Sequence, residues 1–340
     1  MKKSFDRRRA VMAKKAYRKA YGTSVLTVAT IVMLVIVIIT LSVIIAKNSN
    51  DTPDAPDTDN AVGQVTNSVT EAPETDEPFD YSVYKTVACT DKELTRGSLV
   101  LVNRNNAYEL SDSVPLINLF NNKDRKYTVA YADISLENEA FTALGKLTDA
   151  FYAETGKDIL QVTAGHRTKK QQEDFYSSMV SSPEDADYYE LAGFSDHHTG
   201  YSFDVKLYLE DGTSLSYSKN AEEYAPWIVE NYYKYGFVMR YPGDKTEHTG
   251  IIAEGNHFRY VGIPHSAYMH ENNLCLEEYI SYLKNFSVEK PLQILTGGKT
   301  YYVYYTQKTA DSTDVYVPSD GEYTLSGNNT DGFIVTYSQK

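Results

Sequence analysis

Cysteine is scarce in this sequence of 340 residues, and Cys89 and Cys275 are the only two. They permit at most one disulfide bond, and two cysteines so far apart along the chain do not establish one. After residue 23, basic residues are outnumbered by acidic ones. Residues 1–23 hold nine lysines and arginines against one acid, a net charge of +8, so a total of −13 leaves −21 for the rest. A surface this acidic argues against a nucleic-acid partner, because phosphate contacts need basic side chains.

Long hydrophobic runs are absent with one exception, residues 24–46, which carry no charge over 23 residues. Such a run can cross a bilayer core of about 30 Å. The alternative is a cleaved signal peptide, but its apolar region is usually shorter and ends at small residues. We therefore predict a single-pass cell-membrane protein. The basic flank predicts that residues 1–23 are a cytoplasmic tail and that everything after Lys47 lies outside.

The part after the hydrophobic run divides by composition into three segments. Residues 47–80 are rich in Asp, Thr, Pro and Asn and predict a disordered stalk. Residues 81–287 mix helical periodicity, as in 136–156, with short alternating runs, which predicts an α+β domain with a small antiparallel sheet. Residues 288–340 contain only strand and turn signals, without His or Cys, and predict an all-β extension to which we assign no chemistry.

Two local groups of residues could hold a metal ion. The stretch "SDHHTGYSFDV" contains His197, His198 and Asp204, and "EGNH" contains Glu254 and His257. A catalytic zinc takes three protein ligands from such residues, and a nearby carboxylate can take a proton from its water. A histidine pair in a polar loop is often only solvated, whereas a carboxylate between apolar strand residues needs a partner. Spacing alone does not choose between the two adjacent histidines.

Four blocks of the sequence resemble a known family. "SDHHTGYSFD" is similar to the S-x-H-x-x-G-x-[AS]-x-D signature of D-alanyl-D-alanine carboxypeptidases of the VanY type. Three further blocks occur in the same order as in that family: "AGHRTKKQQEDFY", "NYYKYGFVMRYP" followed by "TGI", and "EGNHFRYVG". The resemblance covers about residues 95–285 and implies a zinc metallopeptidase, with the sheet and helices of the α+β domain built around the zinc site.

The resemblance also implies individual roles around a zinc ion. His197, Asp204 and His257 match the positions of the metal ligands, and Glu254 matches the general base. His198 falls at a variable position of the motif, so the resemblance makes it a neighbour and not a ligand.

Substrate contacts follow from the same resemblance. Arg167 matches the cation that steadies the developing oxyanion, while Gln172 and Ser195 match residues that hold the terminal D-alanine. A guanidinium suits this role because it is always charged and donates from a fork of N–H groups.

The chain departs from the family pattern at two positions. Asn256 stands where tryptophan is frequent, and Asp196 stands where glutamate is common. Neither change removes a catalytic group, although Asn256 could alter the wall of the substrate pocket. We interpret Arg240 and Arg259 as framework or supporting residues.

Topology and resemblance together predict the reaction. An extracytoplasmic enzyme meets peptidoglycan stem peptides and lipid-linked precursors, so we predict removal of the terminal D-alanine from a pentapeptide stem. The alternatives are a murein endopeptidase or an L,D-carboxypeptidase of the same fold, and, from another class, an inactive wall-binding module.

Overall fold

The computed structural model describes residues 79–109, 115–122, 126–182 and 187–338. The predicted cytoplasmic tail, membrane segment and all but the last two residues of the predicted stalk lie outside these ranges. Within them, no helix combines the length and the apolar character needed to cross a membrane.

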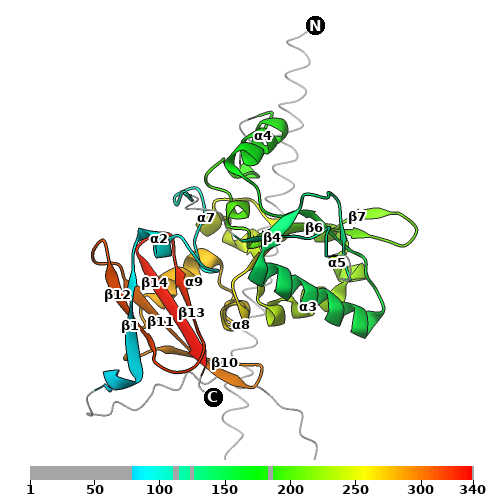
Figure 1. Cartoon of the computed structure of the whole chain (residues 1–340). Coiled ribbons are helices and arrows are strands. Elements are labelled where there is room, and N and C mark those ends of the chain that lie inside the picture. The colour runs from blue at the N-terminus through cyan, green and yellow to red at the C-terminus, as the bar shows by residue number, and fades with distance from the viewer. Residues whose placement is uncertain (1–78, 110–114, 123–125, 183–186, 339–340) are drawn as a thin grey trace, which may run out of the picture. The chain divides into compact units, whose positions relative to one another are not determined.

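The first part of the structure is built on a mixed sheet with the strand order β3-β5-β6-β9-β8, and β7 pairs with β6 outside this path. Two of these strands, β6 and β7, are labelled on the right-hand side of Figure 1. All its pairs are antiparallel except β3 with β5. The strands are β3 (Thr128–Val129), β5 (Leu160–Ala164), β6 (Ser202–Tyr208), β7 (Ser214–Ser216), β8 (Phe237–Tyr241) and β9 (Glu254–Tyr260). The predicted small antiparallel sheet is confirmed, with the parallel pair of β3 and β5 as the difference.

Helices and short elements connect and cover these strands. The α-helices are α2 (Asp91–Leu94), α3 (Asn138–Thr155), α4 (Lys169–Met179), α5 (Tyr217–Tyr224), α6 (Pro226–Asn231), α7 (Thr246–Thr249), α8 (Ile263–Glu271) and α9 (Leu276–Leu283). The 3₁₀ turns are η1 (Tyr81–Val83), η3 (Asp196–Thr199), η4 (Tyr232–Tyr235) and η5 (Gly243–Lys245). A separate antiparallel pair joins β2 (Leu116–Asn118) to β4 (Ser135–Glu137).

The longest helix, α3, follows directly from its sequence. Its N-cap Glu137 accepts a hydrogen bond from the backbone N–H of Glu139, and the helix ends at Gly156 with φ of 71°. Glycine suits this end because the left-handed conformation costs it no steric strain. Apolar residues at helical spacing form the buried face, namely Phe141, Leu144, Leu147 and Phe151.

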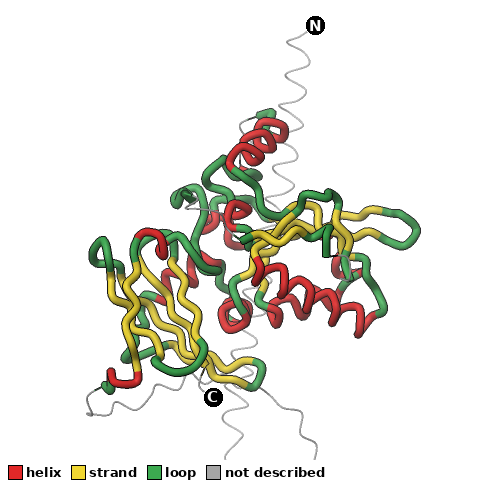
Figure 2. Tube along the Cα trace, viewed as in Figure 1, coloured by secondary structure: helices red, strands yellow, loops and turns green. Residues whose placement is uncertain are grey.

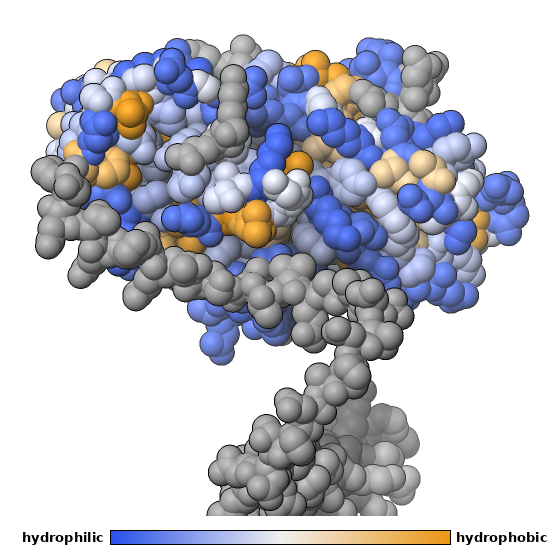
Figure 3. Space-filling view, turned by 90° about the horizontal axis from the view of Figure 1, so that it is seen from below, coloured by the Kyte–Doolittle hydropathy of each residue, from blue (hydrophilic) through white to orange (hydrophobic). Residues whose placement is uncertain are grey.

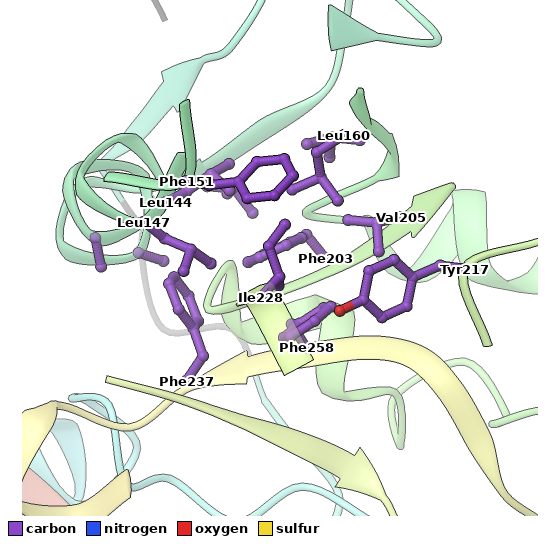
Figure 4. Packing of buried hydrophobic residues seen from close by; sticks show 14 of the residues in the cluster. Leu144, Leu147, Phe151, Leu160, Phe203, Val205, Tyr217, Ile228, Phe237 and Phe258 are labelled. Atoms are coloured by element: carbon purple, nitrogen blue, oxygen red, sulfur yellow. The ribbon is translucent and has the colours of Figure 1, made fainter. Parts of the chain in front are cut away.

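One face of the central sheet forms the main hydrophobic core with α3 (Figure 4). Phe203 on β6 stacks on Phe258 of β9 with ring centroids 5.4 Å apart, and Phe237 of β8 meets Phe203 edge to face. Because side chains alternate along a strand, the residues beside these phenylalanines point to the opposite face. The core therefore determines which residues of β6 and β9 remain available for a site.

The C-terminal part is all-β, as predicted, because residues 292–338 form only strands and loops (Figure 2). Its sheet has the order β10-β11-β14-β13. The strands are β10 (Leu292–Thr296), β11 (Lys299–Gln307), β12 (Thr313–Pro318), β13 (Tyr323–Gly327) and β14 (Gly332–Ser338). An early strand, β1 (Tyr84–Cys89), pairs with β12, a long-range contact that local sequence patterns do not predict.

A second hydrophobic cluster contains residues from both parts of the structure. Leu99 and Val261 belong to it, together with Leu276 of α9, Val303 of β11 and Ile334 of β14. The predicted boundary between residues 287 and 288 thus falls between segments that share buried contacts.

The surface of the described residues is mostly hydrophilic on the face seen in Figure 3, with small separate hydrophobic groups.

Cys89 and Cys275 are both buried and free, so they form no disulfide with each other. Burial raises the pKa of the Cys89 thiol to about 11 and that of Cys275 to about 12.

Replacing Phe258 by alanine should strongly destabilise the protein. Phe258 is 1% exposed between α3 and the sheet, so its removal leaves a cavity, which costs about 3–5 kcal/mol of unfolding free energy. The control is Tyr208→Ala on β6, where the side chain is 42% exposed and the expected change is within about 0.5 kcal/mol. Chemical denaturation of both purified variants measures the difference, and similar midpoints would contradict the packing described above.

Candidate active site

The register of β6 and β9 creates the centre of the site. Asp204 of β6 pairs directly with His257 of β9, and their neighbours Phe203 and Phe258 form the adjacent pair. Since Phe203 and Phe258 fill the core, Asp204 and His257 face away from it. Two residues 53 positions apart in sequence are thereby held side by side.

The third member, His197, comes from the turn η3 that precedes β6. This turn ends at Gly200, whose φ of 75° lets the chain reverse into the strand. A side chain at Gly200 would also come within about 3.0 Å of Leu116 and close to the backbone of Glu137. The glycine of the "HHTG" sequence is therefore required for His197 to reach the sheet.

One ligand atom from each of His197, Asp204 and His257 lies within 4.8 Å of the other two. Nε2 of His197 is 3.3 Å from one carboxylate oxygen of Asp204, and Nδ1 of His257 is 3.1 Å from the other. That second oxygen, Oδ1, is buried and nevertheless accepts no hydrogen bond. One ligand atom from each of the three residues therefore lies close to the other two, while Oδ1 of Asp204 has no hydrogen-bond donor. This arrangement fits a zinc ion with an open fourth position.

The protonation state of His197 also suits a metal ligand. Its Nδ1 lies 2.7 Å from the carbonyl oxygen of Gly165, so Nδ1 carries the proton and Nε2 keeps a free lone pair. Burial lowers the pKa of His197, and the charge of Arg167 lowers it further. A neutral imidazole with Nε2 directed at Asp204 is the form that binds a metal.

Glu254 lies beside the cluster of His197, Asp204 and His257. One of its carboxylate oxygens is 3.5 Å from Nδ1 of His257, and its side chain is 26% exposed. Burial raises the pKa of the Glu254 carboxyl; contact with His257 opposes the rise, while the charges of Asp204 and Glu190 add to it. A carboxylate with a raised pKa next to a metal site is suited to accepting a proton and returning it.

Arg167 contacts the same cluster from the end of β5. Its guanidinium donates to Asp204 over 3.1 Å and to Gln172 over 3.1 Å, and it stacks over the ring of Phe175 at 4.3 Å. The side chain is 14% exposed, so the cation remains within reach of a ligand at the metal site.

The two predicted substrate contacts are more enclosed than Arg167. Gln172 is fully buried, and its amide both accepts from Arg167 and donates to the carbonyl oxygen of Glu190. Ser195 is also fully buried, and its hydroxyl accepts from the backbone N–H of His197. The structure brings both residues next to the site, and their contact with a substrate stays a prediction.

Asp196, one of the two departures from the family pattern, has a place in the site that the sequence does not predict. It is fully buried, and its carboxylate lies 3.6 Å from Nε2 of His257, the ring nitrogen opposite the metal site. It also accepts from Arg259 and Ser202 and lies 3.6 Å from Arg240. Burial alone would raise the pKa of Asp196, but Arg259, with His257 and Arg240, holds it below its ordinary value.

The two arginines around Asp196 are themselves anchored. Arg259 donates to the backbone oxygens of Ser98 and Val100, and Arg240 forms hydrogen bonds with Glu277. The sequence does indicate that Arg259 lies near the site, because it follows His257 by two residues on the same strand and so shares its face. It does not indicate that Asp196 is the partner of Arg259, because the two residues are 63 positions apart.

Two further histidines, His265 and His270, have partners outside the site. His265 is buried between the hydroxyls of Tyr279 and Thr336, and burial lowers its pKa to about 3. His270 stacks on Tyr233 with ring centroids 3.8 Å apart.

Comparison with known proteins agrees with this geometry. The family model of VanY, D-alanyl-D-alanine carboxypeptidase, matches residues 133–263. A D-alanyl-D-alanine carboxypeptidase of Enterococcus faecium is 36% identical over 250 residues, which are 73% of this chain and 77% of the relative. The chain belongs to the VanY family. The predicted family, and the prediction that the chain is a metallopeptidase of the D-alanyl-D-alanine carboxypeptidase type, are confirmed.

Solved structures related to this VanY-family chain include two vancomycin resistance enzymes. The D,D-dipeptidase VanXYg, in complex with a D-Ala-D-Ala phosphinate analogue, has a TM-score of 0.64 and 27% identity, covering 75% of this chain and 99% of that one. A VanY D,D-pentapeptidase variant from a VanB-type cassette, in complex with Zn(II), has a TM-score of 0.44 and 28% identity, covering 54% and 98%. The cluster of His197, Asp204 and His257 is a donor set that zinc binds.

Asp196→Asn should weaken zinc binding because it removes the negative charge that faces His257. The expected rise in the zinc dissociation constant is about 10- to 100-fold, the usual effect of losing a residue that orients a metal ligand. Competition with a chromogenic chelator measures it, and circular dichroism checks the fold.

Asp196→Glu, which keeps the charge, should bind zinc more tightly than Asp196→Asn. Asp211→Asn, in an exposed turn, serves as the matched control. Equal affinities for Asp196→Asn and Asp211→Asn would contradict a role for Asp196 at the metal site.

Proposed function

We propose that this chain is a zinc-dependent D,D-carboxypeptidase that removes the terminal D-alanine from peptidoglycan stem peptides. The observation that carries this proposal is the convergence of His197, Asp204 and His257, with Glu254 and Arg167 at their edge. Three ligands with a carboxylate and a cation beside them are the groups that hydrolysis of a peptide bond requires.

The proposed mechanism assigns a role to each group. His197, Asp204 and His257 would hold the zinc ion, which would make water more acidic and polarise the scissile carbonyl. Glu254 takes a proton from the attacking water, whose oxygen forms a bond to the carbonyl carbon. Arg167 stabilises the negative charge that develops on the carbonyl oxygen. The carbon–nitrogen bond then breaks, and Glu254 returns its proton to the nitrogen of the departing D-alanine.

The sequence supports an extracytoplasmic location for this reaction. Residues 24–46 are long and apolar enough to anchor the chain, and the basic residues before them favour a cytoplasmic N-terminus. We therefore propose stem peptides and lipid-linked precursors as substrates, in preference to a free dipeptide inside the cell.

The full-length protein in detergent should release D-alanine from a stem pentapeptide. A chelator should abolish the release, and added zinc should restore it. A stem tetrapeptide and free D-Ala-D-Ala are assayed alongside. Cleavage of the tetrapeptide alone would establish the L,D-carboxypeptidase alternative, and binding to cell wall without cleavage of any substrate would establish the inactive wall-binding module.

Glu254→Gln should lower kcat by at least about 100-fold, because a neutral amide does not accept the proton of water. Zinc content, measured by atomic absorption, should remain one ion per chain, since the three ligands are intact. Glu247→Gln, on the exposed side of α7, is the control and should keep normal activity. A Glu254→Gln enzyme with unchanged kcat would refute the proposed general base.

A further inference from the structure

His198 lies next to the ligand His197, and the family resemblance assigns it no role. In the structure it is fully buried, and both of its ring nitrogens are engaged. Nε2 accepts from the backbone N–H of Gly193 over 2.8 Å, and Nδ1 lies 2.7 Å from the carbonyl oxygen of Arg167. Because an N–H group only donates and a carbonyl only accepts, the ring must carry its single proton on Nδ1.

His198 therefore connects Arg167 to the segment 190–195. Gln172 makes the same connection at a second point, since it accepts from the Arg167 guanidinium and donates to the carbonyl oxygen of Glu190 over 2.7 Å. The main chain and the side chain of Arg167 are thus each tied to this segment through one buried polar residue. The segment ends at Ser195, which caps the turn carrying His197.

The contacts of Arg167 show why such a connection matters. Its backbone N–H donates to the carbonyl oxygen of His197, and its own carbonyl accepts from His198, so both neighbouring peptide groups are fixed to the turn η3. From this fixed position the guanidinium reaches Asp204 over 3.1 Å. A preorganised cation stabilises developing charge only where its direction is held before the reaction.

We propose that His198 is a positioning residue, whose neutral ring holds Arg167 and the segment 190–195 in the geometry needed to stabilise the oxyanion. It acts through Arg167 and does not bind the metal. The inference rests on the proposed function, because it requires that Arg167 faces the scissile carbonyl oxygen.

The test compares His198→Ala with His198→Gln in the full-length enzyme. Glutamine offers one acceptor and one donor group, so it can replace part of both hydrogen bonds. For His198→Ala we expect kcat to fall about 10- to 100-fold, the range that follows from misplacing a catalytic group. KM and zinc content should stay close to those of the original enzyme. His198→Gln should recover most of the loss, and His248→Ala, at an exposed position, should show none.

A D-Ala-D-Ala phosphinate analogue provides a second measurement, because it resembles the tetrahedral transition state. Its inhibition constant should rise by about the same factor as kcat falls, as expected when an interaction is specific to the transition state. A rise in KM alone, with kcat and the inhibition constant unchanged, would overturn the proposal.

A double-mutant comparison separates positioning from a general loss of structure. In an Arg167→Ala background, His198→Ala should cause little further loss of kcat, because the residue through which it acts is already gone. An undiminished loss in that background would overturn the proposal. If His198→Ala does not fold, His198→Asn replaces it, since its shorter amide does not span both partners.

If the proposed function itself is wrong, these assays give a different result from the one expected when only the role of His198 is wrong. An original enzyme that neither releases D-alanine nor binds the phosphinate would refute the D,D-carboxypeptidase assignment, and with it the proposed role of His198. An active enzyme whose kcat and phosphinate affinity do not change in His198→Ala or His198→Asn would refute only the positioning role.

Discussion

The cross-strand pair of Asp204 and His257 is the contact on which the rest of the site depends. Their positions follow from the adjacent pair Phe203 and Phe258, which the hydrophobic core draws to the other face of the sheet. A slip of one residue in the register of β6 and β9 would exchange the two faces and bury Asp204 and His257 in the core. Hydrophobic packing and metal-site geometry are therefore consequences of the same pairing.

A set of buried charged residues extends from His257 away from the site. Asp196 faces the far nitrogen of His257 and is neutralised by Arg259, which is itself fixed by backbone oxygens of residues 98–100. Leu101 in turn donates to the carbonyl oxygen of Asn328 in the C-terminal β part. A buried carboxylate is tolerated only when such partners compensate its lost hydration. The surroundings of the metal site are thus built from segments spread along the described chain.

Much of this could be predicted from local patterns. The helix ending at Gly156, the strand around Asp204 and the all-β C-terminal part all follow from periodicity and turn residues. The pairing of β1 with β12 and the burial of Asp196 between two arginines could not. These contacts join residues far apart in sequence, and no short-range rule specifies which distant segment comes to lie beside another.

By itself, the sequence determined which kinds of side chain the site contains and which neighbouring residues share a face. The second follows because the separation of two residues along a turn or strand fixes the faces on which they lie. It did not distinguish His197 from His198 without the family resemblance. The tertiary structure makes the distinction by direction: Nε2 of His197 points to Asp204, whereas both nitrogens of His198 are engaged by the backbone of Gly193 and Arg167. The direction of a ring depends on its three-dimensional neighbours, which adjacent positions in a sequence do not share.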